Sequence, residues 1–331
     1  MKARPMPETP GAPARRDARS LPTKSRDSGA SGRDAPLYGA LDLGTNNCRL
    51  LIARPARDGF RVVDSFSRIV RLGEGLSLTG RLDDRAMDRA YDALALCAER
   101  VARKGLDASR LTAVATQACR AADNGQAFID RVRRGTGLRL KIIDPAEEAS
   151  LSVAGCLNLF DPRAEAVLVI DVGDHGFIPG LGVALALGGP SDDAVRQLFD
   201  SGRVHMVGTS GAITSLAGIH LGLRRYQRDL VDGLWMSRAD CEAAAARLKN
   251  LGPAGRAAES CIGPDRADLV LAGAAILEAV QRAWPCERVR VADRGLREGL
   301  LLQRMREDRQ KPRRRRRRGR SNGQAGGAPP T

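Results

Sequence analysis

The amino-acid sequence predicts an α/β protein made of two related lobes. The chain has 331 residues, enough for about two domains. Apolar runs typical of strands alternate with longer segments typical of helices. A short pattern also occurs twice, an apolar run followed by Asp, an apolar residue and Gly, at 37–44 and again at 166–173. This internal repeat predicts two halves of related fold with a cleft between them.

The first predicted lobe covers residues 37–165. Alternating apolar residues predict a three-stranded meander over 37–72. An acidic residue, Asp83 or Asp84, is expected to start the first long helix, whose apolar face includes Cys97. The predicted helices are 83–104, 124–135 and 145–157, and the predicted strands after the meander are 111–116 and 138–143. The expected order of elements is βββαβαβα.

The second predicted lobe covers residues 166–310 and begins with the apolar strand 166–172. Its expected helices are 191–200, 211–221, 237–250, 265–283 and 295–308, and its further strands are 204–207 and 288–291. The stretch 176–190 is rich in Gly and Ala and has no clear period. We interpret it as a damaged or deleted part of this lobe, which is therefore shortened at about 174–203.

The net charge of +15 is concentrated in the two ends of the chain. Residues 1–36 carry eight basic and four acidic residues, and 311–320 carry eight basic residues and no acidic one. Both ends, 1–36 and 311–331, have few apolar residues and are predicted to be disordered. The run Arg313–Arg318 could bind nucleic acid or polyphosphate by charge alone. The alternative is a solvated tail without a dedicated partner.

The composition of the body is that of an intracellular globular protein. Apolar residues make up 43% of the chain and aromatic residues only 3%, so we expect a core of Ala, Leu, Val and Ile. No apolar run reaches the roughly 18 residues of a membrane span, and the start lacks the apolar region of a signal peptide. Seven cysteines without a CxxC pair favour reduced, mostly buried thiols in the cytoplasm.

The most informative local feature is the turn Gly44-Thr45-Asn46-Asn47, between two apolar runs. Glycine, hydroxyl and amide residues in a tight turn direct N–H groups inward, and such a turn binds anions, phosphate above all. Asp42 at the mouth of this turn is better suited to a metal ion or a water than to the phosphate. An ordinary hairpin is the alternative interpretation.

Other candidate groups have structural interpretations of equal or greater weight when each is taken alone. Gly208-Thr209-Ser210-Gly211 precedes a helix and predicts either an anion site or a cap made by Thr209 or Ser210. Glu147 and Glu148 favour the first turn of a helix. Arg120 is typical of an exposed helix surface, and His175 of a loop.

Taken together, the motifs resemble the Ppx/GppA family of exopolyphosphatases and guanosine pentaphosphate phosphohydrolases. In chain order they are Asp42–Asn47, Arg71–Leu76 (RLGEGL), Val114–Arg120 with Asn124, Ala146–Ala149 (AEEA), Gly208–Gly211, Arg266–Gly273 and Ala292–Gly299. The resemblance covers most of residues 37–310. It implies the two-lobed actin-like fold found in sugar kinases and Hsp70.

The resemblance also implies a function and a set of site residues. The implied reaction is release of terminal phosphate from inorganic polyphosphate or pppGpp, a guanosine alarmone of the stringent response. Glu148 is the implied general base, and Asp42 and Asp171 are the implied carboxylates for Mg²⁺. The implied phosphate ligands are Gly44, Thr45, Asn46, Asn47, Arg120, Gly173, Gly208, Thr209, Ser210 and Gly211. Dimers are common in the family, but the sequence decides neither the oligomeric state nor the preferred substrate.

The sequence departs from the family at the second phosphate turn, where the family pattern is DxGGGSTE. The strand and its acid are kept at Val169–Gly173, but Asp174-His175-Gly176-Phe177-Ile178 follows. Asp174 adds negative charge where phosphate is expected, and two unit charges about 4 Å apart repel by roughly 1 kcal/mol in water and roughly 4 kcal/mol when partly desolvated. Three hypotheses therefore stand: a hydrolase, a catalytically weakened homologue that binds polyphosphate, alarmone or RNA, and a decayed coding region whose second lobe folds poorly.

Overall fold

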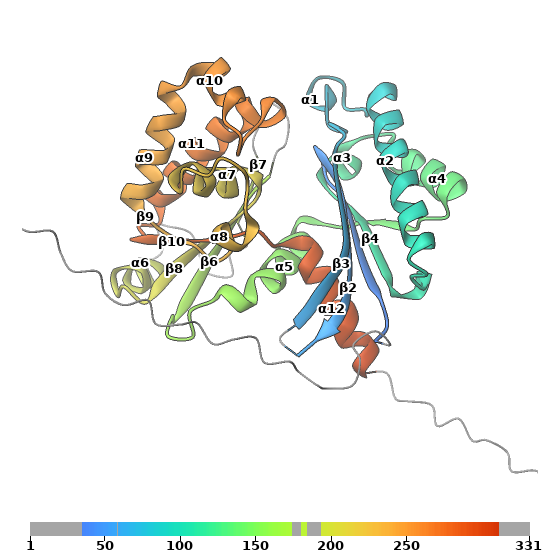
Figure 1. Cartoon of the computed structure of the whole chain (residues 1–331), viewed down its shortest axis with the longest axis horizontal. Helices are drawn as coiled ribbons and strands as arrows, with labels where there is room; N and C mark the ends of the chain where they lie inside the picture. Colours follow the sequence, from blue (N-terminus) through green and yellow to red (C-terminus); the bar gives the residue numbers. More distant parts are fainter. Residues whose placement is uncertain (1–34, 58, 174–179, 184–192, 311–331) are drawn as a thin grey trace, which may run out of the picture. The chain divides into compact units, whose positions relative to one another are not determined.

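A computed structural model describes residues 35–57, 59–173, 180–183 and 193–310 (Figure 1). The predicted disordered ends lie outside the described residues, apart from 35 and 36. The altered segment Asp174–Ile178 lies outside them as well.

The first lobe contains a five-stranded sheet in the order β3-β2-β1-β4-β5. Its strands are β1 (Tyr38–Leu43), β2 (Asn47–Ala56), β3 (Gly59–Ile69), β4 (Leu111–Ala115) and β5 (Leu140–Ile142). The first three strands pair antiparallel, and β1, β4 and β5 pair parallel. The predicted meander and both later strands are confirmed.

The helices of the first lobe confirm the predicted order and add short elements. They are α1 (Leu76–Thr79), α2 (Asp84–Arg103), α3 (Gln117–Ala121), α4 (Gly125–Thr136) and α5 (Pro145–Cys156), with 3₁₀ turns at Ala108–Arg110 and Leu157–Leu159. Asp83 caps α2 because its side chain accepts a hydrogen bond from the Ala86 N–H at 3.1 Å. Helix α2 buries the predicted apolar stripe, including Leu94 and Cys97, against the sheet.

The second lobe contains another five-stranded sheet, in the order β7-β6-β8-β10-β9. Its strands are β6 (Ala166–Gly173), β7 (Gly180–Val183), β8 (Val204–Thr209), β9 (Trp235–Ser237) and β10 (Arg288–Ala292). Strand β6 has an antiparallel neighbour, β7, and a parallel one, β8, as β1 has β2 and β4. The predicted internal repeat is therefore confirmed by sheet topology.

The stretch 176–190, which we interpreted as damaged or deleted, is not wholly deleted, because it contains β7, and its other residues lie outside the described ones. Strand β7 has four residues where β2 has ten, and no described strand pairs on its outer side as β3 does on β2. A four-residue strand with two glycines, GLGV, is too short and too rich in glycine to be predicted from its sequence. The described part of this lobe is shortened, but it retains the strand beside β6.

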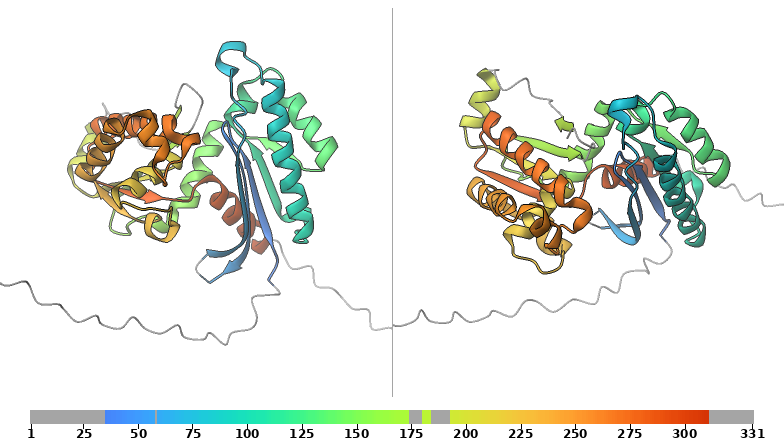
Figure 2. Two further views of the ribbon diagram at one scale, coloured as in Figure 1. Left: turned by 45° about the horizontal axis from the view of Figure 1, so that its top comes forward. Right: turned by 90° about the horizontal axis from the view of Figure 1, so that it is seen from above.

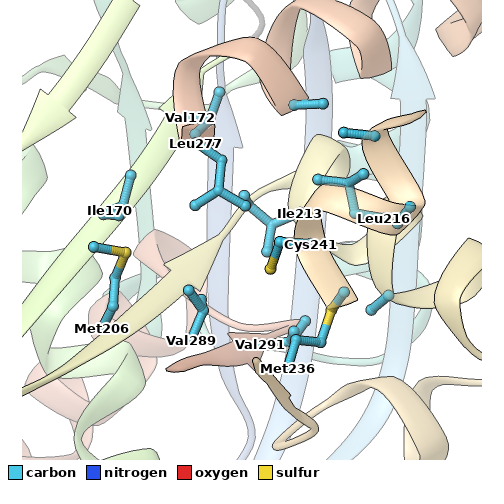
Figure 3. Packing of buried hydrophobic residues seen from close by; sticks show 14 of the residues in the cluster. Ile170, Val172, Met206, Ile213, Leu216, Met236, Cys241, Leu277, Val289 and Val291 are labelled. Carbon is cyan, nitrogen blue, oxygen red and sulfur yellow. The ribbon is translucent and has the colours of Figure 1, made fainter. Parts of the chain in front are cut away.

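The helices of the second lobe are α6 (Asp193–Asp200), α7 (Gly211–His220), α8 (Arg228–Val231), α9 (Arg238–Asn250), α10 (Gly252–Ala258), α11 (Ala267–Ala283) and α12 (Leu296–Gln310), with a 3₁₀ turn at Pro264–Arg266. All five predicted helices are confirmed. Apolar side chains from the sheet, including Met206 and Val289, pack with Ile213 of α7 and Leu277 of α11 (Figure 3).

The last helix of the chain completes the core of the first lobe. Leu300, Leu301 and Met305 of α12 pack with Tyr38 and Leu51 of the first sheet. Conversely, Cys156 at the end of α5 packs with residues of the second sheet. The structure thus differs from the predicted division at 165/166, because α12 follows the second lobe in sequence and packs on the first.

Helices α5 and α12 pack against each other through glycines (Figures 1 and 2). A Cβ on Gly155 would lie 2.0 Å from the carbonyl oxygen of Gly295, and one on Gly299 would lie 1.9 Å from that of Leu151. Only residues without side chains allow two helix backbones to approach this closely. This contact positions Glu148 of α5 relative to the start of α12.

Candidate active site

The turn 44–47 joins β1 to β2 and holds buried polar atoms without partners. The Gly44 N–H donates to the Asn47 carbonyl at 2.9 Å. Thr45 Oγ1 and Asn47 Oδ1 are buried and have no hydrogen-bond partner among the described residues. Gly44 does not have a positive φ, and an added Cβ would make only an ordinary contact, 3.5 Å from the Asn47 oxygen. The fold alone therefore does not explain this glycine or these unpartnered atoms.

The segment after β3 braces this turn. The Val70 and Arg71 N–H groups donate to the Asn46 carbonyl at 2.8 and 3.1 Å, and the Gly73 N–H donates to the Thr45 carbonyl at 3.0 Å. A Cβ on Gly73 would lie 2.3 Å from Thr45 Cγ2. The RLGEGL motif thus fixes the conformation of the predicted phosphate turn, a role that the sequence pattern did not reveal.

Asp42 on β1 is a desolvated carboxyl in a charged environment. Burial raises its pKa to about 6, against the opposing effect of Arg49 and Arg297 and with smaller contributions from Asp171 and Glu298. Its Oδ1 is buried without a hydrogen-bond partner among the described residues. An acid held in this way is stabilised by any cation or donor that reaches it.

We expect Asp42→Asn to stabilise the ligand-free protein. The raised pKa means that the unfolded state loses this proton first, so stability falls as pH rises from about 4 to about 6. Removing the ionisable group should raise the free energy of unfolding by about 3 kcal/mol above pH 7. At pH 5 the gain should be about half as large. Urea denaturation at both pH values measures it, and equal or lower stability of the variant at high pH would contradict the prediction.

Glu148 and Arg120, both implied as site residues by the resemblance, lie next to each other. Arg120 Nη1 lies 3.4 Å from Glu148 Oε2 and donates to the Ile143 carbonyl at 2.6 Å, while Nη2 donates to Gln117 Oε1 at 2.6 Å. Burial raises the pKa of Glu148 to about 7, Arg120 lowers it, and Asp42 and Asp171 add to the rise. Arg120 is therefore part of a partly buried network, not the exposed helix arginine of the alternative interpretation.

Glu147 differs from its neighbour. Its carboxylate pairs with Lys141 at 2.8 Å on the exposed side of α5, and its N–H donates to the capping Asp144 side chain. The alternative interpretation, that the pair lies in the first turn of a helix, is confirmed for both glutamates, and for Glu147 no further role is apparent. Glu148 is the member of the pair that interacts with Arg120 and is affected electrostatically by Asp42 and Asp171.

Asp171 on β6 contributes the second lobe's carboxylate. Ser152 Oγ of α5 donates to Asp171 Oδ2 at 3.1 Å, and Asp171 acts electrostatically on both Asp42 and Glu148. Gly173 ends β6, pairs with Gly180, and directly precedes the residues outside the described set. Acids on β1 and β6, the two strands that share the repeated pattern, thus act on one another.

The donor set fits a hard cation. Among the described residues, no three His, Cys, Asp or Glu side chains form a metal-binding group. Mg²⁺ does not require such a group, because it is commonly held by one or two carboxylates together with waters and substrate phosphates. The unpartnered Asp42 Oδ1 supports this fit. Asp42 and Asp171 would be the residues that hold Mg²⁺, and this assignment stays a prediction.

The residues 208–211 have structural roles in the fold. Ser210 caps α7 by accepting a hydrogen bond from the Ile213 N–H at 3.5 Å, and Thr209 Oγ1 donates to the Arg294 carbonyl at 2.7 Å. A Cβ on Gly208 would lie 3.0 Å from Ile213 Cγ2. The capping interpretation is confirmed for Ser210 and not for Thr209. An anion-binding role for 208–211 stays a prediction.

Sequence reasoning missed two charged residues at the start of α12. Arg297 acts on Asp42, and burial lowers the pKa of its guanidinium, whereas Glu298 raises it. Glu298 is 2% exposed, accepts from the Gly295 N–H at 2.9 Å and lies 3.6 Å from Arg228. In the sequence, the two residues could have been recognised only from the many charged residues within the motif ADRGLREG.

The stretch VDGLW, for which the sequence suggested no role, holds this motif in place. Asp232 Oδ1 accepts from the Asp293 N–H at 3.0 Å and from Arg294 Nε at 3.1 Å. The Gly233 N–H donates to the Val291 carbonyl at 2.8 Å. Asp232 thereby fixes the loop that leads into α12 and its charged residues.

Two lobes of related topology, with acids on β1 and β6 acting on one another, define an actin-like α/β protein with a site built from both lobes. The chain belongs to the Ppx/GppA phosphatase family, whose model matches residues 51–174 and 190–308. Solved members have the same fold. The Aquifex aeolicus member has a TM-score of 0.66 at 23% identity, covering 82% of this chain and 98% of that chain. An exopolyphosphatase from Cytophaga hutchinsonii has a TM-score of 0.65 at 22% identity, covering 80% and 96%.

Two curated relatives share about a quarter of their aligned residues with this chain. A guanosine-5'-triphosphate,3'-diphosphate pyrophosphatase of Photobacterium profundum is 26% identical over 307 residues, covering 82% of this chain and 60% of the relative. Exopolyphosphatase 1 of Mycobacterium leprae is 26% identical over 310 residues, covering 81% and 89%. The chain thus spans about 60% of the first relative's length. Within the described residues, no helix has the length and apolar character needed to span a membrane.

Proposed function

We propose that this protein hydrolyses the terminal phosphoanhydride bond of inorganic polyphosphate or of pppGpp, with Glu148 as general base. The observation that carries the proposal is the state of Glu148. Its carboxyl is desolvated, its pKa is raised to about 7, and it lies beside Arg120 and near Asp42. A base whose pKa is close to the working pH combines a useful ionised fraction with proton affinity.

The side chains have complementary roles in the proposed reaction. The turn 44–47 holds the terminal phosphoryl group through its N–H and side-chain donors, and the Arg120 guanidinium offsets charge on the phosphoryl oxygens. Bound Mg²⁺ would neutralise part of the phosphate charge. Glu148 accepts a proton from water as the water oxygen bonds to phosphorus. The bridging P–O bond breaks, and the shortened chain leaves with the bonding electrons.

The names of the relatives support both substrate classes. One relative carries the name of an exopolyphosphatase and another that of a guanosine nucleotide pyrophosphatase, each at 26% identity. The 26% identity to each relative does not distinguish residues that select polyphosphate from residues that select pppGpp. The two substrates therefore stand side by side in the proposal.

Phosphate release from purified protein, with Mg²⁺ and either polyphosphate or pppGpp, tests the proposal. Release that depends on the protein and stops when the chelator EDTA removes Mg²⁺ is expected for at least one substrate.

The second candidate, a weakened homologue, is favoured by the departure at Asp174–Ile178. It predicts that tripolyphosphate raises the melting temperature without phosphate release. If the protein neither releases phosphate nor is stabilised by tripolyphosphate, both candidate functions are contradicted.

The pH dependence of kcat/KM should report the buried acids. Glu148 must be ionised to accept a proton, so the rate should rise tenfold per pH unit below about 7 and level off above it. Initial rates between pH 5 and 9 measure the profile. A rate independent of pH across this range would contradict the assignment of the base.

A further inference from the structure

Arg297, the second residue of α12, has a guanidinium without a hydrogen-bond acceptor in the part of the chain that the structure describes. Its ion contact there is with Glu298, whose Oε1 lies 3.9 Å from Arg297 Nη2, too far for a hydrogen bond. The Arg297 side chain is 18% exposed, and none of its nitrogens is among the fully buried atoms without partners. Its donors are therefore open to a ligand.

The surroundings of Arg297 disfavour its charge in the ligand-free protein. Burial lowers the pKa of this guanidinium and Arg49 lowers it further, whereas Glu298 and Asp42 raise it. Arg297 also lies in the first turn of α12, where the positive end of the helix dipole repels a cation. Because the described residues give its donors no acceptor, a bound anion would satisfy both the donors and the charge.

The packing of α12 places Arg297 beside the predicted phosphate turn. Helix α12 packs on the first sheet (Figure 1), and Gly295 and Gly299, on either side of Arg297 in the sequence, lie against the backbone of α5. Arg297 acts electrostatically on Asp42, which lies at the mouth of the turn 44–47. A phosphate group held by that turn would therefore have this guanidinium near it.

Two other arginines near the acids already bond to the protein. Arg120 donates to the Ile143 carbonyl and to Gln117, both at 2.6 Å. Arg228 donates to the Asp293 carbonyl at 2.6 Å, and its Nε lies 3.2 Å from the Asp293 carboxylate. The fold thus uses part of each of these guanidinium groups, whereas it leaves that of Arg297 available.

Building on the proposed hydrolysis of phosphoanhydrides, we propose that Arg297 is a further catalytic residue, which donates to oxygens of the terminal phosphoryl group held by the turn 44–47. A planar guanidinium fork can donate two parallel hydrogen bonds to phosphate oxygens. Arg297 and Arg120 would then offset the phosphoryl charge together. Because Arg297 belongs to α12, this contact forms only once the last described helix has packed on the first lobe.

Isothermal titration calorimetry of the full chain with methylenediphosphonate, whose P–C–P bridge cannot be hydrolysed, tests the contact without turnover. Arg297→Gln should weaken binding of this probe by about tenfold or more, because charge-assisted hydrogen bonds are lost. Arg297→Lys keeps the charge but not the fork, and it should weaken binding by about threefold or more. Unchanged binding in Arg297→Lys would overturn the proposed fork even if Arg297→Gln fails to fold, and unchanged binding in Arg297→Gln would overturn the contact.

Arg306→Gln is the matched control, because it removes the same charge from the same helix. Arg306 is exposed and forms no ion pair within the described ranges. Its replacement should change the Kd of the probe by less than about twofold, since an exposed charge far from the ligand is screened by salt. Equal losses in Arg306→Gln and Arg297→Gln would show a general effect of net charge and would overturn the contact.

A double-mutant cycle separates direct contact from an effect that acts through Asp42. If Arg297 donates to the phosphoryl oxygens, Arg297→Gln should cause a similar fold-loss of binding in the wild-type and Asp42→Asn proteins. A loss that disappears in Asp42→Asn would overturn the direct contact, as would a wild-type protein that does not bind the probe up to about 5 mM. Binding that depends on Arg297, without phosphate release from polyphosphate or pppGpp, would support the contact and contradict only the proposed hydrolysis.

Discussion

Replacing Glu148 by Gln is expected to lower kcat for phosphate release by a factor of about 10³. Glutamine keeps the size and packing of the side chain but cannot accept the proton of the attacking water. Because the replacement also removes a desolvated charge, it should not destabilise the fold. Tripolyphosphate should therefore still raise the melting temperature of the variant. Steady-state phosphate release, compared with thermal unfolding in the presence of that ligand, measures the two effects separately.

Glu147→Gln is the matched control for this experiment. It makes the same chemical change one residue earlier on α5, where the carboxylate pairs with Lys141 on the exposed side. Its activity should stay within about twofold of wild type, since an exposed ion pair contributes little to stability. Similar losses in both variants, or near-normal turnover in Glu148→Gln, would remove Glu148 from the role of base.

A single methyl group at the crossing of α5 and α12 should have the largest effect on stability. In Gly299→Ala the new Cβ would lie 1.9 Å from the Leu151 carbonyl oxygen, so the two helix backbones must separate. We expect the free energy of unfolding to fall by about 3 kcal/mol. Activity should fall as well, because α5 carries Glu148 and α12 carries Arg297. Urea denaturation followed by circular dichroism measures the loss of stability.

Gly135→Ala provides a control with the same nominal overlap. The new Cβ would lie 1.9 Å from the hydroxyl of Tyr91, the end of a side chain that can rotate away. Alanine is also the better helix former within α4, which offsets part of any strain. Gly135→Ala should therefore change the free energy of unfolding by less than about 1 kcal/mol. If the two variants lose equal stability, backbone contact is not what makes Gly299 necessary.

The elements that could be predicted were those with local signals. Helix α2 has a capping acid and an apolar stripe over 20 residues, and β1 and β6 share an apolar run ending in an acid. Strand β7 has four residues and two glycines, and α8 and β9 are also too short to show a period. These elements form because neighbouring strands and helices provide their partners, which no local pattern records.

The candidate site divides in the same way. The turn 44–47 could be predicted from residue types alone, and Glu148 and Arg120 only from the family resemblance. The approach of Arg297 to Asp42 joins residues 255 positions apart in sequence and depends on how α12 packs. The support of the turn by Gly73 depends on the three-dimensional fold, which places the Thr45 methyl group only 2.3 Å from where a Cβ on Gly73 would lie.

Because α12 packs on the first sheet, the core of the first lobe can be completed only after almost the whole folded region has been synthesised. Leu300, Leu301 and Met305 cover Tyr38 and Leu51, which leave the ribosome some 250 residues earlier. Apolar surface on the first-synthesised half must therefore stay uncovered, or be shielded by a chaperone, until translation has passed the second half. If the ribosome stalls before residue 296, the first sheet keeps exposed apolar surface, and this sheet, far from the stall point, is then the aggregation-prone part of the nascent chain.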